Sequence, residues 1–409
     1  MINRPEYLKD LFLFKDKPLI KIIMGVRRCG KSTLLELFRL ELQKLGIEAN
    51  QIQAYNFEDL ENEPLKNYKK LHDHITANLV KNKKNYIFLD EIQIVPEFGK
   101  AVDSLYLKKN VDIYLTGSNS KMQSKDIANQ IERQYVTMHM FPLSFKEYLS
   151  VYSFPDSLER AFNDYIQYGA FPEVSNFINT HEGKIELQQM IKTYLSDLYD
   201  KIVLKDIVEN KGISNTSRLE SVIRFMAGNI GSETSINNIS KTMTADGRKI
   251  DTHTTENFIN AFCDSFILYK ADRYDIKGKK LLKTLNKYFL VDTGFRYILL
   301  GDKKNDTGHV LENIVYLELL RRGYNVYIGK TGEHEIDFVA EGTNGTEYYQ
   351  VSQTVRDKNT LARELTPLNS IRNHSLKFLL TRDYEPNISH NGIRQLNVLE
   401  WLLGYHHGN

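Results

Sequence analysis

The sequence has few cysteines, little net charge and no long apolar run, and each of these absences excludes a class of protein. Its 409 residues include two cysteines, which cannot build a disulfide framework and fit a reducing cytoplasm. No run of about eighteen apolar residues occurs, so we expect no membrane-spanning helix and no membrane partner. The net charge of +2 makes no general demand for a nucleic-acid partner, so DNA binding would need a local basic face.

The first third of the chain alternates short apolar runs with helical patterns, which is typical of a parallel α/β sheet. The apolar runs are rich in Ile, Val, Tyr and Leu, as strands buried on both faces must be. From residue 143 to residue 210 the strand pattern stops and the sequence turns helical. The expected strands lie at 19–24, 51–56, 86–89, 112–115 and 135–140, and the expected helices at 32–45 and 68–81.

Further domains are expected downstream, because 409 residues are too many for one compact core. The order helix, short helix, helix, hairpin is that of a winged helix-turn-helix, with elements predicted at 218–229, 235–243, 252–264, 266–272 and 280–284. The last part mixes a helix with strands, predicted at 309–322, 325–329, 335–340, 348–352 and 377–380. We therefore expect domains at 1–210, 211–285 and 286–409.

A phosphate-binding motif follows the first predicted strand. Residues 25–32 read GVRRCGKS, which fits G-x-x-x-x-G-K-[ST] between a strand and a helix. Such a loop turns successive backbone N–H groups toward phosphate oxygens, while Lys31 would reach the β- and γ-phosphates of ATP and Ser32 would ligate Mg²⁺. The alternative is a glycine-rich turn that fits the motif by chance. The candidate ATP-binding residues here are Gly25, Val26, Arg27, Arg28, Cys29, Gly30, Lys31, Ser32 and Thr33.

Two carboxylates follow the strand predicted at 86–89. At the carboxyl edge of a parallel sheet they would lie beside the phosphate-binding loop, with Asp90 holding Mg²⁺ through water and Glu91 acting as the general base on the attacking water. Acidic residues also end strands simply to cap the next helix, which is the alternative. The joint occurrence with the phosphate-binding motif favours a phosphoryl-transfer site.

Small polar residues follow the strand predicted at 112–115. Thr116, Ser118 or Asn119 would present a hydroxyl or an amide to the γ-phosphate or to the water, because ligands gather at the carboxyl ends of strands in open α/β sheets. An ordinary turn built from Gly and Ser is the alternative. We favour Ser118 as a catalytic residue.

These motifs resemble the AAA+-type ATPase family that carries a C-terminal domain of unknown function in many bacterial and archaeal proteins. The resemblance implies an α/β ATPase core with a helical lid, a winged-helix segment, and a C-terminal fold similar to PD-(D/E)XK nucleases. It covers nearly the whole chain, through GVRRCGKSTLL, YNFEDL, IFLDEIQ, YLTGSNS, FPLSFKEYL, YIQYGAFPEV, KYFLVDTGFRYILLG, LENIVYLELLRRGYNV, HEIDFVA and YYQVSQ.

The resemblance assigns two further residues to the nucleotide. It makes Gly169 to Pro172 the turn of the lid that approaches ATP, although a helix stop before Pro172 explains the same residues. The family usually has a Gly-Arg pair before the strand at 135–140, whereas Gln134 stands in that arginine position here and Arg133 is shifted by one residue. Arg133 is either an arginine finger for the ATP of a neighbouring subunit, which would require a homo-oligomer, or an exposed arginine without a catalytic role.

The C-terminal residues match the nuclease pattern only in part. Glu312, Asp337 and Gln350 have the order of the metal ligands, but Gln350 replaces a carboxylate and Ser352 stands where the lysine is expected. We therefore expect a nuclease-like fold that serves binding or assembly. The whole sequence predicts a Mg²⁺-dependent ATPase associated with DNA through the winged helix; a nucleotide switch that binds a protein partner and an ATP-gated nuclease are the alternatives.

Overall fold

The computed structural model describes residues 1–118, 127, 129–152, 157–180, 183–209, 211–213, 215–245, 247–301, 307–384 and 388–405. The chain forms two compact units, the first made of Met1–Pro142 with Asp264–Phe266 and the second of Leu143–Cys263 with Ile267–Asn409. The helical region expected to end the ATPase domain is therefore packed with the C-terminal half. The division at 210 and 285 stays a prediction.

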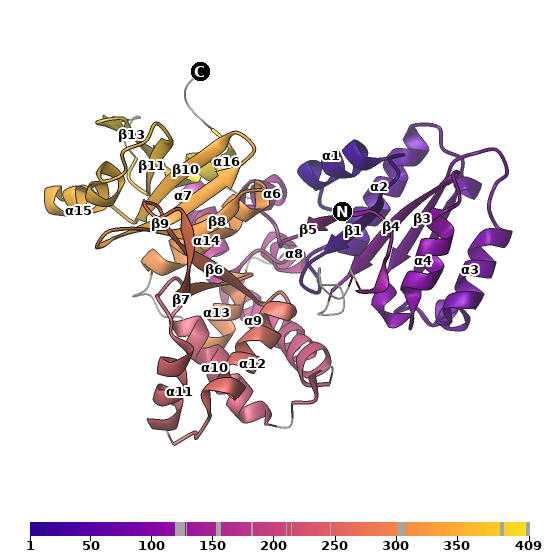
Figure 1. Ribbon diagram of the computed structural model, residues 1–409, viewed down its shortest axis with the longest axis horizontal. Helices are drawn as coiled ribbons and strands as arrows, with labels where there is room; N and C mark the ends of the chain where they lie inside the picture. Colours follow the sequence, from indigo (N-terminus) through magenta and orange to yellow (C-terminus); the bar gives the residue numbers. More distant parts are fainter. Residues whose placement is uncertain are drawn as a thin grey trace. The chain divides into compact units, whose positions relative to one another are not determined.

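The first unit is a five-stranded parallel sheet of order β2-β3-β4-β1-β5, with α1 and α2 on one side and α3 and α4 on the other (Figure 1). All five predicted strands are confirmed. The strands are β1 (Ile20–Met24), β2 (Ile52–Asn56), β3 (Asn85–Asp90), β4 (Val111–Gly117) and β5 (Tyr135–His139). The helices are α1 (Pro5–Phe14), α2 (Lys31–Lys44), η1 (Ala49–Gln51), η2 (Leu60–Leu65), α3 (Tyr68–Ala77), η3 (Ile92–Ile94) and α4 (Phe98–Tyr106).

The packing of α2 on this sheet fixes where the phosphate-binding loop lies. Apolar residues three and four positions apart bury one face of α2, and the ring of Phe38 lies 5.2 Å from Tyr114 and 6.3 Å from Phe88. These contacts hold the first turn of α2 directly after the carboxyl end of β1. The loop between them is thus confined to the edge where β3 and β4 also end.

The second unit combines helices with a mixed eight-stranded sheet of order β12-β13-β11-β10-β9-β8-β6-β7 (Figure 1). Its helices are α6 (Phe145–Val151), α7 (Leu158–Tyr168), α8 (Pro172–Thr180), α9 (Lys184–Lys201), η5 (Ile202–Glu209), α10 (Thr216–Gly228), α11 (Ile236–Ala245), α12 (Thr252–Asp264), α13 (Thr293–Leu300), α14 (Thr307–Arg321), α15 (Lys358–Asn369) and α16 (Val398–Leu403). Its strands are β6 (Leu268–Asp275), β7 (Lys280–Leu290), β8 (Asn325–Thr331), β9 (His334–Gly342), β10 (Gly345–Ser352), β11 (Leu376–Thr381), β12 (Ile388–His390) and β13 (Ile393–Asn397).

The hairpin predicted as part of the winged helix belongs to this sheet. Three helices do precede it, but β6 pairs in parallel with β8, and Ile276 donates its backbone N–H to Lys330 at 2.9 Å. The return strand β7 is also longer than predicted and continues to Leu290, across the predicted domain boundary. The winged helix stays a prediction.

A buried carboxylate joins the turn after α7 to the start of α13. Asp292 caps α13 by accepting the backbone N–H of Gly294 at 2.8 Å, and its other oxygen accepts the N–H of Ala170 at 2.7 Å. Gly169 has a φ of +79°, and a Cβ there would lie 1.8 Å from the carboxylate of Asp292. The helices that follow residue 143 are therefore attached to the C-terminal half by a contact that only glycine allows.

Candidate functional site

The backbone of the phosphate-binding loop needs glycine at two places. A Cβ on Gly25 would lie 2.1 Å from the carbonyl oxygen of Met140, and Gly30 has a φ of +109° directly before α2. Arg28, at the exposed tip, also has a positive φ of 63°. This loop is a tight backbone cup at a helix N-terminus, which is the geometry that binds phosphate.

Lys31, the first residue of α2, lies inside the cup. Its side chain is 4 % exposed, and its ammonium donates to the carbonyl oxygens of Gly25 at 3.1 Å and Val26 at 3.2 Å. Its Nζ also lies 3.8 Å from Oε1 of Glu91. The structure therefore brings the predicted phosphate ligand and the predicted base to one place.

Asp90 lies at the end of β3 within reach of two hydroxyl groups. Ser32 and Thr116 both donate hydrogen bonds to its carboxylate. Burial raises the pKa of Asp90 above its ordinary value, and the two hydroxyl donors oppose this. A serine hydroxyl next to a carboxylate is a set of oxygen donors that suits Mg²⁺.

Glu91 is held by several contacts and by an unusual backbone. Its φ is +54°, and its N–H donates to the hydroxyl of Thr116 at 3.0 Å. One carboxylate oxygen, Oε2, accepts from Ser118 at 2.8 Å and from Nε2 of Gln93 at 2.5 Å. Burial opposes ionisation, but Lys31 and these donors keep the pKa of Glu91 below its ordinary value. These contacts favour the ionised form of the buried Glu91.

The other predicted residues of the loop are arranged around this centre. Val26 and Cys29 are buried, Arg27 forms an ion pair with Glu58 at 2.9 Å, and Thr33 is half-buried in the first turn of α2. The carbonyl of Cys29 accepts from the buried Arg4 at 3.0 Å.

The sequence-based prediction missed or undervalued three residues that support this site. Thr116 contacts both carboxylate residues, Gln93 contacts Glu91, and Arg4 supports the loop from more than twenty residues away. The residue types gave a signal only for Thr116, since it follows a predicted strand. Asn119, the third candidate after that strand, lies outside the described residues.

The structure does not bring Arg133 to the phosphate-binding loop of its own chain. Arg133 precedes β5, and β5 runs parallel to β1 with Tyr135 opposite Ile20. Arg133 is exposed at the amino edge of the sheet, whereas the loop begins at the carboxyl edge. The five residues of β1, which rise about 3.3 Å each, separate the two edges. Pro172 begins α8 in the second unit, next to the turn that Asp292 holds. Its role toward ATP stays a prediction.

A second group of charged residues lies at the nuclease-like positions of the second unit. Lys287 is buried, and its Nζ lies 2.7 Å from Glu335 and 3.6 Å from Glu312. Burial together with the neighbouring carboxylates raises the pKa of Glu312 to about 7 and that of Asp337 well above its ordinary value. Within the described ranges, no three metal-ligating side chains come close enough together to hold a metal ion.

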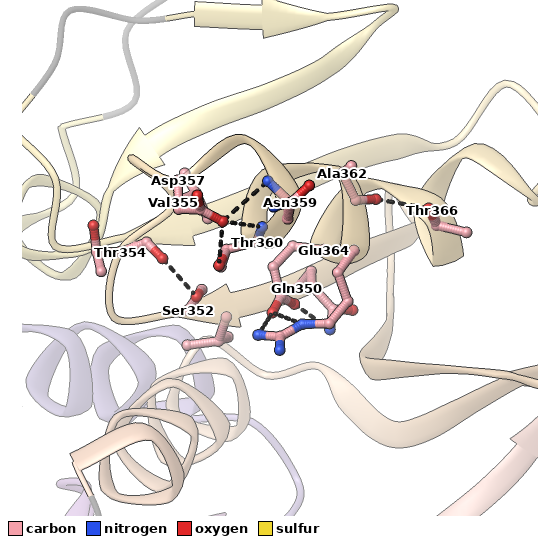
Figure 2. A network of polar contacts seen from close by, with 12 residues as sticks. Gln350, Ser352, Thr354, Val355, Asp357, Asn359, Thr360, Ala362, Glu364 and Thr366 are labelled. Atoms are coloured by element: carbon pink, nitrogen blue, oxygen red, sulfur yellow. Dashed lines mark hydrogen bonds and ion pairs between the residues drawn. The ribbon is translucent and has the colours of Figure 1, made fainter.

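Gln350 is engaged in this second group rather than free. Its amide donates to Glu364 at 3.0 Å (Figure 2). Glu364 is also paired with Arg363 at 2.8 Å. Ser352 donates to the carbonyl oxygen of Thr354 at 3.2 Å. The lysine of this group comes from β7, since Lys287 pairs with Glu312 and Glu335 although it lies more than sixty residues before Gln350 in the sequence.

Comparison with known proteins supports an ATPase fold for the first unit. Residues 17–149 match the AAA domain family, and residues 159–306 match a domain of unknown function, DUF8612. The Walker-type ATPase PABY2304 of Pyrococcus abyssi has a similar fold, with a TM-score of 0.50 at 13 % identity over 73 % of this chain and 96 % of that one. The fold and the loop geometry thus define a P-loop ATPase domain of the AAA type.

Two relatives are similar to this chain over nearly its whole length. An uncharacterized protein of Haemophilus influenzae is 38 % identical over 98 % of this chain and 99 % of its own length. An uncharacterized protein of Methanocaldococcus jannaschii is 29 % identical over 88 % of this chain and 79 % of its own length. The chain belongs to the family of the Haemophilus protein, and its AAA domain is followed by a domain of unknown function. No helix in the described part is long and apolar enough to span a membrane.

Proposed function

We propose that this protein binds and hydrolyses ATP with Mg²⁺, and that its nucleotide state controls the second unit. The observation that carries the proposal is the convergence of Lys31, Asp90 and Glu91 at the carboxyl edge of one sheet. A structural ion pair would explain Lys31 and Glu91 alone. It would not explain why a backbone cup, a hydroxyl–carboxylate pair and an oriented buried carboxylate meet at the same edge.

The residues divide the reaction between them. Backbone N–H groups of the loop and the ammonium of Lys31 would bind the β- and γ-phosphates, and Lys31 would exchange its two carbonyl contacts for phosphate oxygens. Ser32 and Asp90 would hold Mg²⁺, which when bound offsets phosphate charge. Since Ser118 and Gln93 fix Oε2 of Glu91, Oε1 is the oxygen left to accept a proton from the attacking water.

The test is phosphate release by the purified full-length chain, measured with ATP in the presence and absence of Mg²⁺. Hydrolysis that requires Mg²⁺ supports the proposal, and its absence at every ATP concentration contradicts it. Adding double- or single-stranded DNA to the same assay separates two outputs. Stimulation by DNA favours a DNA-associated ATPase, whereas tight nucleotide retention without stimulation favours a switch that binds a protein partner. In a homo-oligomer, Arg133 would serve the site of the neighbouring copy.

The case for DNA depends on exposed basic side chains around the helices and the hairpin. Lys241, Arg248, Lys249 and His253 are exposed near α11 and α12, and the turn of the hairpin exposes three more lysines. Exposed acidic residues, Asp251 and Glu256, dilute this surface, and Asp246 lies outside the described residues. Such turns also collect lysines for solubility, and winged helices also bind proteins, so a direct measurement is needed.

Replacing Lys277, Lys279 and Lys280 together by Glu is expected to weaken DNA binding and flatten its salt dependence. Each lysine that contacts a phosphate contributes about one to the slope of log affinity against log salt, so the slope should fall by about three. The measurement is fluorescence anisotropy with labelled duplex DNA at several salt concentrations. Lys69, Lys70 and Lys81, which are exposed on the first unit, provide a control triple. Equal affinity and slope in the parent and the hairpin variant would exclude a DNA-contacting hairpin.

The nuclease-like part is expected to show no metal-dependent cleavage of DNA. Lys287 already pairs with Glu312 and Glu335 there, and Gln350 is held by Glu364. The measurement is incubation of plasmid and linear DNA with the protein and Mg²⁺ or Mn²⁺, followed by gel electrophoresis. Cleavage that the parent shows and the Asp337→Ala variant lacks would prove the expectation wrong.

A further inference from the structure

Gln93 lies next to the base of the ATPase site, and its amide makes an uneven set of contacts. It belongs to η3, directly after Glu91, and its side chain is 7 % exposed. Its Nε2 donates to Oε2 of Glu91 at 2.5 Å. Its Oε1 is buried and has no hydrogen-bond partner. The two ends of one amide group are therefore used very differently.

The carboxylate of Glu91 decides this orientation. An ionised carboxylate only accepts hydrogen bonds, so the NH₂ group of Gln93 must face it, and a flipped amide would bring two oxygens together. The amide oxygen is then turned away from the carboxylate and is buried without a partner. A buried polar atom without a partner is costly, and such atoms in native proteins call for an explanation. Stability alone does not explain why a glutamine is present here.

Gln93 and Ser118 hold the same oxygen of the Glu91 carboxylate. Ser118 and Gln93 both donate to Oε2, whereas Lys31 faces Oε1. Two donors on one oxygen fix the rotation of the carboxylate about its last bond and turn the other oxygen toward the phosphate-binding loop. The positive φ of Glu91 adds to this, because it turns the residue out of the line of β3. A leucine of similar size would fill the space but release one of the two donors.

We propose that Gln93 is a positioning residue for ATP hydrolysis, one that orients the carboxylate of Glu91 through Oε2 so that Oε1 meets the attacking water. This inference rests on the proposed function. Gln93 itself contacts neither phosphate nor water in the reaction. Its removal should therefore change the rate of hydrolysis and leave nucleotide affinity unchanged.

The first test compares Gln93→Leu with the parent in full-length protein. Turnover should fall by up to about a hundred-fold, as for a reacting group displaced by about an ångström, with unchanged binding of a fluorescent ATP analogue. Gln53→Leu is the matched control, because Gln53 is a buried glutamine in the neighbouring β2 that donates to Ile75 at 3.3 Å. Parent-like turnover by Gln93→Leu would overturn the inference, as would an equal loss in both variants.

The second test uses the Glu91→Gln background and single-turnover conditions with radiolabelled ATP. If Gln93 acts through Glu91, adding Gln93→Leu should cause no further loss, because the group that it positions is already gone. Independent effects that multiply would contradict the inference. Should Gln93→Leu prove insoluble, Gln93→Glu decides, because it keeps the shape and places a carboxylate against Glu91; parent-like turnover of that variant would also overturn the inference.

These outcomes separate the inference from the proposed function. A parent protein that never hydrolyses ATP contradicts the ATPase proposal. A parent that hydrolyses ATP, together with a Gln93→Leu variant of equal rate, contradicts only the role of Gln93. Both are supported if Gln93→Leu lowers the rate of hydrolysis at unchanged nucleotide affinity, if Gln53→Leu does not, and if Gln93→Leu causes no further loss when added to Glu91→Gln.

Discussion

Replacing Glu91 by Gln is expected to leave ATP binding intact and to slow turnover about a hundred- to ten-thousand-fold, the usual loss for a positioned general base. The amide keeps the size of the side chain but cannot take a proton from water. Binding should persist because, in the proposed mechanism, Lys31 and the backbone of the loop rather than Glu91 would contact the phosphates. The measurements are steady-state phosphate release and equilibrium binding of a labelled ATP analogue.

The control for Glu91→Gln is Glu97→Gln. Glu97 also has a positive φ, of 55°, and lies six positions along the same segment, but its side chain is 55 % exposed and is paired with Lys100. The Glu97→Gln substitution should not change the rate of ATP turnover. A Glu91→Gln protein that hydrolyses ATP at the parent rate would prove the assignment of the base wrong.

Lys31→Ala should abolish nucleotide binding itself. The ammonium is buried in the cup, and no other lysine of the described residues contacts the carbonyl oxygens of Gly25 and Val26. Lys44→Ala, at the other end of α2, where the side chain is 71 % exposed, should bind ATP like the parent. Lys31→Ala and Glu91→Gln thus separate the proposed phosphate binding by Lys31 from the proposed water activation by Glu91.

The geometry of the candidate nucleotide site was predictable because its sequence signals are local. A buried strand, the loop motif and a helix with one apolar face follow each other within residues 20–44, and the two carboxylates end a strand of the same parallel sheet. The carboxyl ends of parallel strands meet at one edge whatever the rest of the fold does. What could not be predicted is the direction of each side chain. The contact of Gln93 with Glu91 depends on a left-handed backbone that the residue type does not announce.

The second unit was less predictable because its decisive contacts join distant residues. Three helices and a hairpin read locally as a winged helix, but β6 pairs with β8 as well as with β7, and β8 lies some fifty residues further along the chain. Lys287 was missed for the same reason, since the carboxylates that surround it come from α14 and β9. Pairing between remote strands is set by the packing of the whole sheet, and no single window of sequence contains it.

Replacing Asp292 by Ala should strongly destabilise the second unit, because this carboxylate is buried and serves two elements at once. The substitution removes the acceptor for two buried N–H groups, those of Ala170 and Gly294, at about 1–3 kcal/mol each. The expected loss is therefore about 2–6 kcal/mol. Asp292→Asn should lose less, because one acceptor oxygen remains while the new NH₂ group faces a backbone donor. Gly169→Ala should also destabilise, since its Cβ would collide with the carboxylate.

The single tryptophan of the chain makes this measurable in the second unit alone. Trp401 is fully buried there, so its fluorescence during urea unfolding follows that unit without a signal from the ATPase domain. Asp357→Ala is the matched control, because Asp357 caps α15 by accepting two backbone N–H groups at 3.0 Å but is exposed (Figure 2). Water can replace that acceptor, so Asp357→Ala should lower the free energy of unfolding by only about 0.5–2 kcal/mol. If Asp292→Ala unfolds no earlier in urea than Asp357→Ala, the buried carboxylate does not hold the helices of residues 143–209 to the C-terminal half.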